Sequence, residues 1–160
     1  MLSRREVFRI MAAGSVLMVK PSRLWASVSP SAEAALRDAD VVYIATQRKN
    51  GERSTARPVW FYYDNGKIFF TTAPTSWKAK RISRGSPLYM WVGSEKGPFL
   101  TGRAEAVADP AYVDRMGEAY ADKYWIAWLG LFRPRSSRVT EGKTRAYVVT
   151  LSEGDASALG

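Results

Sequence analysis

Short apolar segments separated by tight-turn sequences are the feature that most constrains the fold of this chain. Two turns, at Asn50-Gly51 and Asp64-Asn65-Gly66, contain the residues that take up the positive φ of a tight hairpin. The segments around them are rich in β-branched and aromatic residues, which favour strands. Six strands are therefore predicted, at 41–47, 54–64, 67–72, 87–94, 99–109 and 144–152.

Strands linked mainly by hairpin turns, with few helices, predict a mainly β fold: a six-stranded antiparallel barrel, closed or partly open. Three helices are expected, at 32–40, 76–84 and 110–121, each after a serine, threonine or aspartate that can cap it. Pro58 has no N–H to give to a sheet. The strand that contains it is therefore expected at an edge or a bulge.

The 160-residue chain contains neither histidine nor cysteine. It therefore lacks the commonest general base, the commonest metal and haem ligand, and any thiolate. Its acidic residues form no paired metal-binding motif. These observations argue against a metal enzyme or a Ser/His/Asp hydrolase. Any chemistry is expected to come from a bound cofactor.

The first 27 residues have the character of an export signal. Ser3-Arg4-Arg5 followed by Phe8 resembles the twin-arginine signal, and the ten-residue apolar run 10–19 that follows is too short to span a bilayer. We expect a twin-arginine-type leader at 1–27, one domain at 28–152, a tail at 153–160 and a periplasmic location. Membrane contact is expected only through an uncleaved leader. A cytoplasmic protein with an amphipathic or disordered N-terminal helix is the alternative.

Beyond the leader, 19 basic and 14 acidic residues leave a moderate positive charge. That charge suits a phosphorylated ligand as well as a nucleic acid. A nucleic-acid-binding barrel would need aromatic side chains on an exposed face of the sheet. The aromatic residues here lie in apolar strand segments instead. No nucleic-acid partner is therefore expected.

The segment 69–85, FFTTAPTSWKAKRISRG, combines the parts of an anion site. Thr71 and Thr72 end a strand, Ser76 is placed to cap the next helix, and Lys78 lies in its first turn. Hydroxyls, free amides and a cation at a helix start attract an anion. A solvated basic helix is the alternative, and it is the expected state of Lys80, Arg81 and Arg84.

Residues 57–60, RPVW, lie one hairpin away from that segment. Arg57 could lie beside the end of the third strand and add a bidentate phosphate contact. Because a bulge at Pro58 would free ladder positions, the backbone of Val59 and Trp60 could face a planar ring. An arginine on the rim of a sheet and a tryptophan in the core are the alternative.

Taken in order from Tyr43 to about Val107, these motifs resemble the pyridoxamine 5'-phosphate oxidase-like FMN-binding split barrels. The shared pattern is a strand ending Ala-Thr, an Asn-Gly hairpin, PVWF, a turn with glycine, F-x-T, S-x-K with a basic helix, and G-x-A. The resemblance implies a six-stranded antiparallel split barrel. It also implies a homodimer with two flavin sites at the interface.

The resemblance further implies which residues contact the flavin. The ring and ribityl chain would lie against Arg57, Pro58, Val59 and Trp60, and the phosphate end against Thr71, Thr72, Ser76, Trp77 and Lys78. The second subunit of such dimers closes the site with aromatic or basic residues. Candidates here are Tyr124, Trp125, Trp128 and Arg133.

The implied function is that of an FMN-dependent oxidoreductase acting on a small substrate with a small-molecule electron donor or acceptor. True pyridoxamine phosphate oxidases use an Arg-x-His motif, and haem-degrading relatives rely on histidine, so neither activity is expected of a chain without histidine. Two alternatives stay open. One is a deazaflavin-dependent reductase, whose longer cofactor could use Lys80, Arg81 and Arg84. The other is a non-catalytic flavin carrier or sensor.

Overall fold

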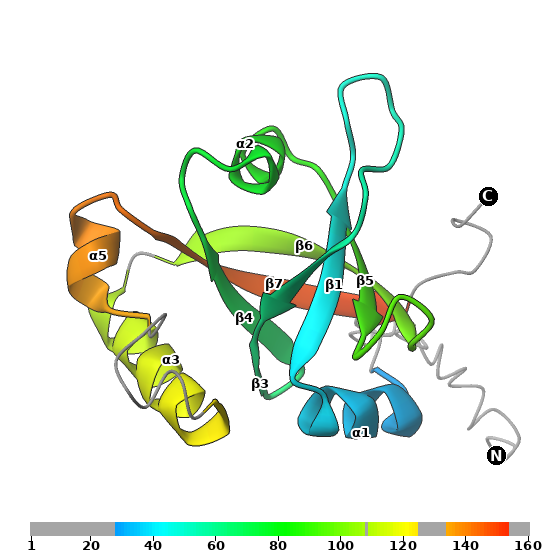
Figure 1. Cartoon of the computed structure of the whole chain (residues 1–160), viewed down its shortest axis with the longest axis horizontal. Coiled ribbons are helices and arrows are strands. Elements are labelled where there is room, and N and C mark those ends of the chain that lie inside the picture. The colour runs from blue at the N-terminus through cyan, green and yellow to red at the C-terminus, as the bar shows by residue number, and fades with distance from the viewer. Residues whose placement is uncertain (1–27, 108, 125–133, 154–160) are drawn as a thin grey trace, which may run out of the picture.

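The computed structural model describes residues 28–107, 109–124 and 134–153. The expected leader and all but the first residue of the expected tail lie outside these ranges. The strands are β1 (Val41–Thr46), β2 (Arg57–Trp60), β3 (Tyr62–Asp64), β4 (Lys67–Thr72), β5 (Leu88–Val92), β6 (Phe99–Val107) and β7 (Arg145–Glu153). The helices are α1 (Pro30–Asp38), α2 (Trp77–Ser83), α3 (Pro110–Lys123) and α5 (Ser136–Thr140) (Figure 1).

The strands form one antiparallel sheet in the order β2-β1-β5-β6-β7-β4-β3. Its two edge strands, β2 and β3, are consecutive in the chain with Phe61 between them. The sheet therefore curls until its two edges approach each other, which produces a nearly closed barrel (Figure 1). The mainly β, antiparallel barrel predicted from the sequence is confirmed.

The sheet has seven strands and not six because the segment expected as one strand at 54–64 is interrupted at Phe61. Phe61 is fully buried, and its backbone N–H and carbonyl lie 3.2 and 3.1 Å from the Tyr124 hydroxyl. A side chain from the end of α3 thus takes the place of a neighbouring strand at this residue. The chain can then leave one edge of the sheet and join the other.

Pro58 lies in β2, opposite Tyr43 of β1. Because β2 is an edge strand, the absence of an N–H on Pro58 interrupts no pairing on the open side. The predicted edge position is therefore confirmed. The two hairpin turns are confirmed as well, with positive φ at Gly51, Asn65 and Gly66.

The barrel interior follows the period-two alternation of its strands. In β5, Leu88, Met90 and Val92 point into the core, while Tyr89 and Trp91 between them are half-buried on the outside. Leu36 of α1 is fully buried in the same cluster, so this helix covers one end of the barrel. Each such buried side chain contributes about 2 kcal/mol of transfer free energy.

The side chains that cap α1, α2 and α3 are serine and aspartate, as the sequence predicts. The Ser76 hydroxyl accepts a hydrogen bond from the Ala79 N–H (3.1 Å), and the Asp109 carboxylate accepts one from the Ala111 N–H (2.9 Å). α3 runs two residues beyond its expected end. None of the helices in the described ranges has the length and apolar character needed to cross a membrane.

α2 lies at one end of the barrel beside the β1–β2 hairpin, whereas α1 and α3 lie toward the opposite end (Figure 1). This arrangement separates two pockets. One is at the start of α2. The other is between α1 and α3.

Candidate functional site

The start of α2 is tied to the end of β4 by hydroxyl groups. Thr72 donates a hydrogen bond to the Ser76 hydroxyl (3.1 Å), which in turn accepts from the Ala79 N–H. The Ser76 side chain is therefore fixed by two partners at once. The loop between them, 73–75, brings the strand end and the first turn of the helix to the same place.

A pocket of about 350 Å³ opens at this point, and we call it the α2 pocket. It is bounded by β1, the β1–β2 hairpin, the start of β2, the end of β4 and the first turns of α2. Its lining consists of Ile44, Thr46, Arg48, Ser54, Thr55, Arg57, Thr72, Ser76, Trp77, Lys78 and Arg81. Four of these side chains are cationic, and among the described residues that line the pocket none is acidic.

Five of the nine predicted site residues meet in the α2 pocket: Arg57, Thr72, Ser76, Trp77 and Lys78. The other four lie outside its lining. Thr71 is half-buried in β4 opposite Ala146, and Pro58 is exposed on the edge strand. Val59 packs against the barrel core, and Trp60 packs against α3.

Lys78 is the electrostatically unusual group of the α2 pocket. Burial lowers the pKa of its ammonium to about 8, because the charged form has lost part of its hydration. In the described part of the chain, no carboxylate forms an ion pair with it. A desolvated cation that lacks a protein counterion is suited to an anionic ligand.

Arg81 belongs to this pocket, although the sequence predicted it to be solvated. Its guanidinium donates a hydrogen bond to the hydroxyl of Thr46 (3.2 Å), a residue that is only 2% exposed. The Thr46 hydroxyl also lies 3.3 Å from that of Ser54. The prediction is wrong for Arg81 because the long side chain reaches back from α2 to β1. Lys80 and Arg84 are exposed, as predicted.

Trp60 lies in an aromatic cluster with Tyr120 and Tyr124 of the same chain. Its ring stacks on that of Tyr124 at 4.4 Å and 6°, and its carbonyl accepts a hydrogen bond from the Tyr120 hydroxyl (2.6 Å). Burial raises the pKa of Tyr124 to about 12 and that of Tyr120 well above its usual value. Both phenols are therefore neutral hydrogen-bond donors at ordinary pH.

The burial of Tyr124 argues against its expected role in closing the site of a second subunit. Its side chain is 7% exposed. The ring stacks on Trp60, and the hydroxyl forms hydrogen bonds with the backbone of Phe61 and the carbonyl of Asp40. The side chain therefore has little surface to offer a second subunit. The other three candidates, Trp125, Trp128 and Arg133, lie outside the described residues.

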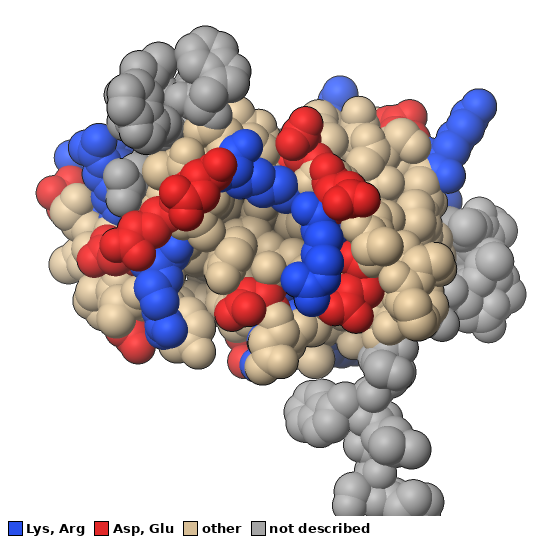
Figure 2. Space-filling model, turned by 90° about the horizontal axis from the view of Figure 1, so that it is seen from below, with Lys and Arg blue, Asp and Glu red and all other residues tan. Residues whose placement is uncertain are grey.

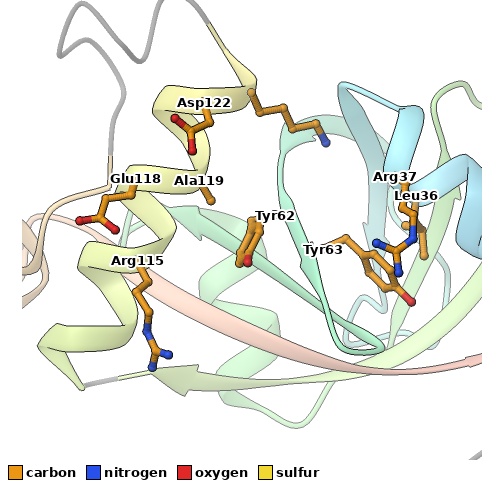
Figure 3. A pocket seen from close by; sticks show the side chains of 9 residues that line it. Leu36, Arg37, Tyr62, Tyr63, Arg115, Glu118, Ala119 and Asp122 are labelled. Atoms are coloured by element: carbon orange, nitrogen blue, oxygen red, sulfur yellow. The ribbon is translucent and has the colours of Figure 1, made fainter.

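A second, larger pocket of about 640 Å³ lies between α1, β3 and α3. Figure 3 shows Tyr62 and Tyr63 of β3 between side chains of the two helices. Arg37, Arg115 and Lys123 share its lining with Glu118 and Asp122. Figure 2 shows the corresponding face of the molecule, where acidic and basic side chains are intermingled. This lining carries side chains of both charge signs and contains none of the nine predicted residues.

The sequence and the fold were compared with those of known proteins. The family model described as "Pyridoxamine 5'-phosphate oxidase" matches residues 28–156. The chain belongs to this family. The resemblance seen in its sequence motifs is therefore confirmed at the level of the family. The chain matches none of the curated proteins.

Solved structures of the same fold carry varied names. An F420 reductase is 19% identical, with a TM-score of 0.52, and the match covers 78% of this chain and 96% of the other. The flavocytochrome Anf3 of Azotobacter vinelandii is 15% identical, with a TM-score of 0.56 and coverage of 79% and 65%. A NimC/NimA family protein of Clostridium acetobutylicum is 17% identical, with a TM-score of 0.54 and coverage of 78% and 84%. At these identities the likeness shows the fold.

Proposed function

We propose that the chain is a flavin-dependent oxidoreductase that binds FMN with the phosphate in the α2 pocket. The observation that carries the proposal is Lys78, whose desolvated ammonium has no carboxylate partner in the described part of the chain. Family membership and fold neighbours named as a flavocytochrome and an F420 reductase support a flavin-type cofactor.

The composition of the α2 pocket fits a phosphate monoester. Such a group carries a charge of about −1.5 to −2 at neutral pH and has three strong acceptor oxygens. Arg57, Lys78 and Arg81 supply cations, and the lining also contains the hydroxyls of Thr55 and Ser76. Within the described residues the Ser76 hydroxyl only accepts hydrogen bonds, so its proton can be given to a ligand. A ligand with this charge would compensate the desolvation of Lys78.

The edge of β2 leads from this pocket to the residues proposed for the flavin ring. Arg57 lines the pocket, and Pro58, Val59 and Trp60 follow it along the strand. Because an edge strand is paired on one side, part of its backbone is open to a planar ligand. The Trp60 carbonyl is already bonded to Tyr120, so other backbone groups of β2 must serve the ring.

When bound, FMN supplies hydride or electron transfer, and the chain's residues hold and orient it and exclude water. A cofactor that supplies the chemistry agrees with a chain that has no histidine or cysteine to act as acid, base or nucleophile. A small substrate is proposed, as the family resemblance implies.

A homodimer is part of the proposal. Pro58 is exposed on the edge strand, so a ring lying against β2 would be open to solvent in a single copy. A second copy would cover that side and exclude water from the ring. Sedimentation of the full chain with and without FMN tests the dimer, and a monomer in both conditions would contradict it.

Residues 1–27 are proposed to direct export by the twin-arginine route. The test is to express the full chain in a bacterium with a functional twin-arginine system and to fractionate the cells. The protein is expected in the periplasmic fraction, and Arg4→Lys with Arg5→Lys should retain it in the cytoplasm. If the two forms divide equally between the periplasmic and cytoplasmic fractions, residues 1–27 do not act as a twin-arginine leader.

Titration of the purified protein with FMN and with riboflavin tests the phosphate assignment, with flavin fluorescence as the readout. FMN should bind more tightly, and Lys78→Gln should weaken FMN by about tenfold or more while leaving riboflavin little changed. Lys96→Gln, an exposed lysine of the β5–β6 loop, is the matched control. A protein that binds neither flavin would overturn the proposal.

Two alternatives are separated by further measurements on the same preparation. Tighter binding of the deazaflavin F420 than of FMN would favour the deazaflavin reductase, for which the F420 reductase of similar fold is the supporting observation. Failure of NADPH or NADH to bleach the bound flavin, under conditions in which dithionite does so, would favour a carrier or sensor.

A further inference from the structure

A further basic pocket borders the α2 pocket and shares three of its lining residues. This pocket, which we call the outer pocket, has a volume of about 270 Å³ and lies between the tip of the β1–β2 hairpin and α2. Figure 1 shows the hairpin and the helix at the same end of the barrel. The outer pocket is lined by Arg48, Lys49, Asn50, Trp77, Arg81 and Arg84.

Three residues belong to both pockets: Arg48, Trp77 and Arg81. The two spaces are therefore neighbours along one tract and not independent sites. Arg81 is held from the side of the α2 pocket by the Thr46 hydroxyl. Its guanidinium is consequently fixed in the wall between them, where it can contact anionic groups on either side.

The outer pocket has an excess of positive charge. Four of its six lining residues are cationic, and none of the described residues that line it is acidic. Glu52 pairs with Arg48 at 3.6 Å, but both side chains are largely exposed, so this pair contributes little. Lys49, Arg81 and Arg84 form no ion pair within the described ranges. The tract therefore attracts a second anionic group beyond the one in the α2 pocket.

Trp77 adds an aromatic surface to this charge. It is 66% exposed, although Lys80 and Arg81 lie over its ring at 4.8 and 5.6 Å. An indole exposed to this extent contributes little to the core. Lining both pockets, it offers a platform on which a planar base can stack, and such stacking is worth about 1–3 kcal/mol per base in other proteins, roughly 5- to 150-fold in affinity.

We infer that the outer pocket binds the adenosine 5'-phosphate part of a dinucleotide, with the base on Trp77 and its phosphate at Arg81, Arg84 and Lys49. The inference rests on the proposed function, because the α2 pocket is taken to hold the flavin phosphate. Two sources share this chemistry. One is FAD bound in place of FMN, and the other is a nicotinamide dinucleotide that donates electrons to bound FMN.

The test is calorimetric titration of ADP into the FMN-loaded full-length protein. ADP is expected to bind beside FMN, and Trp77→Ala should weaken it by about fivefold or more. Arg84→Gln should weaken ADP about tenfold without changing the affinity for FMN, since Arg84 lines only the outer pocket. Lys96→Gln should behave as the unaltered protein. Absence of ADP binding, or displacement of FMN by ADP, would overturn the inference.

Two further arms identify the source. Tighter binding of FAD than of FMN, with the advantage lost in Arg84→Gln, assigns the outer pocket to the cofactor itself. If FAD has no advantage, competitive inhibition of NADPH oxidation by ADP assigns it to the electron donor. If the tailed deazaflavin F420 binds and ADP does not, the inference that the outer pocket binds a nucleotide is wrong.

Failure of the proposed function is distinguishable from failure of this inference. A protein that binds no flavin can still be titrated with ADP in the flavin-free state. Sensitivity of that binding to Trp77→Ala and Arg84→Gln, but not to Lys78→Gln, would support the outer pocket on its own. Sensitivity to Lys78→Gln alone would place the nucleotide in the α2 pocket and overturn the inference.

Discussion

The hydroxyl of Tyr124 lies 3.2 Å from the backbone nitrogen of Phe61 and 3.1 Å from its carbonyl oxygen, 63 residues away in the chain. It accepts a hydrogen bond from the Phe61 N–H and donates one to the carbonyl of Phe61 or of Asp40. Phe61 is the residue at which the chain passes from β2 to β3. One side chain at the end of α3 thus satisfies the backbone at the gap in the barrel.

Tyr124→Phe should destabilise the protein by about 1–3 kcal/mol, because it leaves buried backbone groups of Phe61 without a partner. The loss is measured as a lower urea midpoint in equilibrium unfolding. Tyr112→Phe is the matched control, since Tyr112 is 43% exposed and stacks on Phe69 through its ring alone. Equal effects of the two changes would show that the Tyr124 hydroxyl does not bridge the gap.

Lys78 should make the stability of the flavin-free protein depend on pH. Its folded-state pKa of about 8 lies below the ordinary value of 10.5, so its burial opposes folding while the group is charged. The penalty is fully present below about pH 8. Stability rises between pH 8 and 10.5, because in that window the unfolded chain holds a proton that the folded chain has released.

The comparison with Lys78→Met isolates this effect from other titrating groups. The variant should be more stable than the unaltered chain by about 2 kcal/mol at pH 7, a figure reduced from the full pKa shift for solvent screening. The difference should shrink steadily toward pH 10. A difference that stays constant over this range would mean that Lys78 is not desolvated.

The affinity for FMN should fall as pH rises above about 8, since the phosphate binds the protonated Lys78 and burial lowers the pKa of that group. Riboflavin affinity should change little over the same range. Fluorescence titrations at pH 7 and 9.5 measure both. Lys78→Arg should abolish the pH dependence, because arginine stays charged.

Arg81→Met should weaken FMN by about tenfold through loss of a charged contact and of the hydrogen bond that holds the wall of the pocket. Arg84→Met, at the C-terminal cap of the same helix, should leave FMN affinity unchanged because Arg84 does not line the α2 pocket. A larger loss of FMN affinity in Arg84→Met than in Arg81→Met would instead support the prediction from the sequence that Arg81 is solvated.

Gly102→Ala should destabilise the barrel by about 1–3 kcal/mol through overpacking. A Cβ at this position in β6 would lie 2.6 Å from Val149 Cγ1 and 2.8 Å from the Thr150 carbonyl of β7. Thermal unfolding measures the change. Ala106→Thr on the exposed face of the same strand should alter stability by no more than about 0.5 kcal/mol, and a comparable loss there would point to a general sensitivity of β6.

The sequence by itself determined the local features of this protein. Strand positions follow from segments rich in β-branched and aromatic residues, such as those that form β1 and β4. Turn residues required positive φ at Gly51 and Gly66, and Ser76 and Asp109 cap the helices they precede. Each depends on residues close together in the chain, which is why each could be predicted without the fold.

Only the tertiary structure decided the division at Phe61, the burial of Tyr124 and the place of Arg81. Each depends on a contact between residues far apart in the chain: Tyr124 with Phe61, and Arg81 with Thr46. The sequence placed cations near the start of α2, but it could not tell which side chain reaches a neighbouring strand. Long, flexible side chains choose among several partners, and that choice is made by the packing around them.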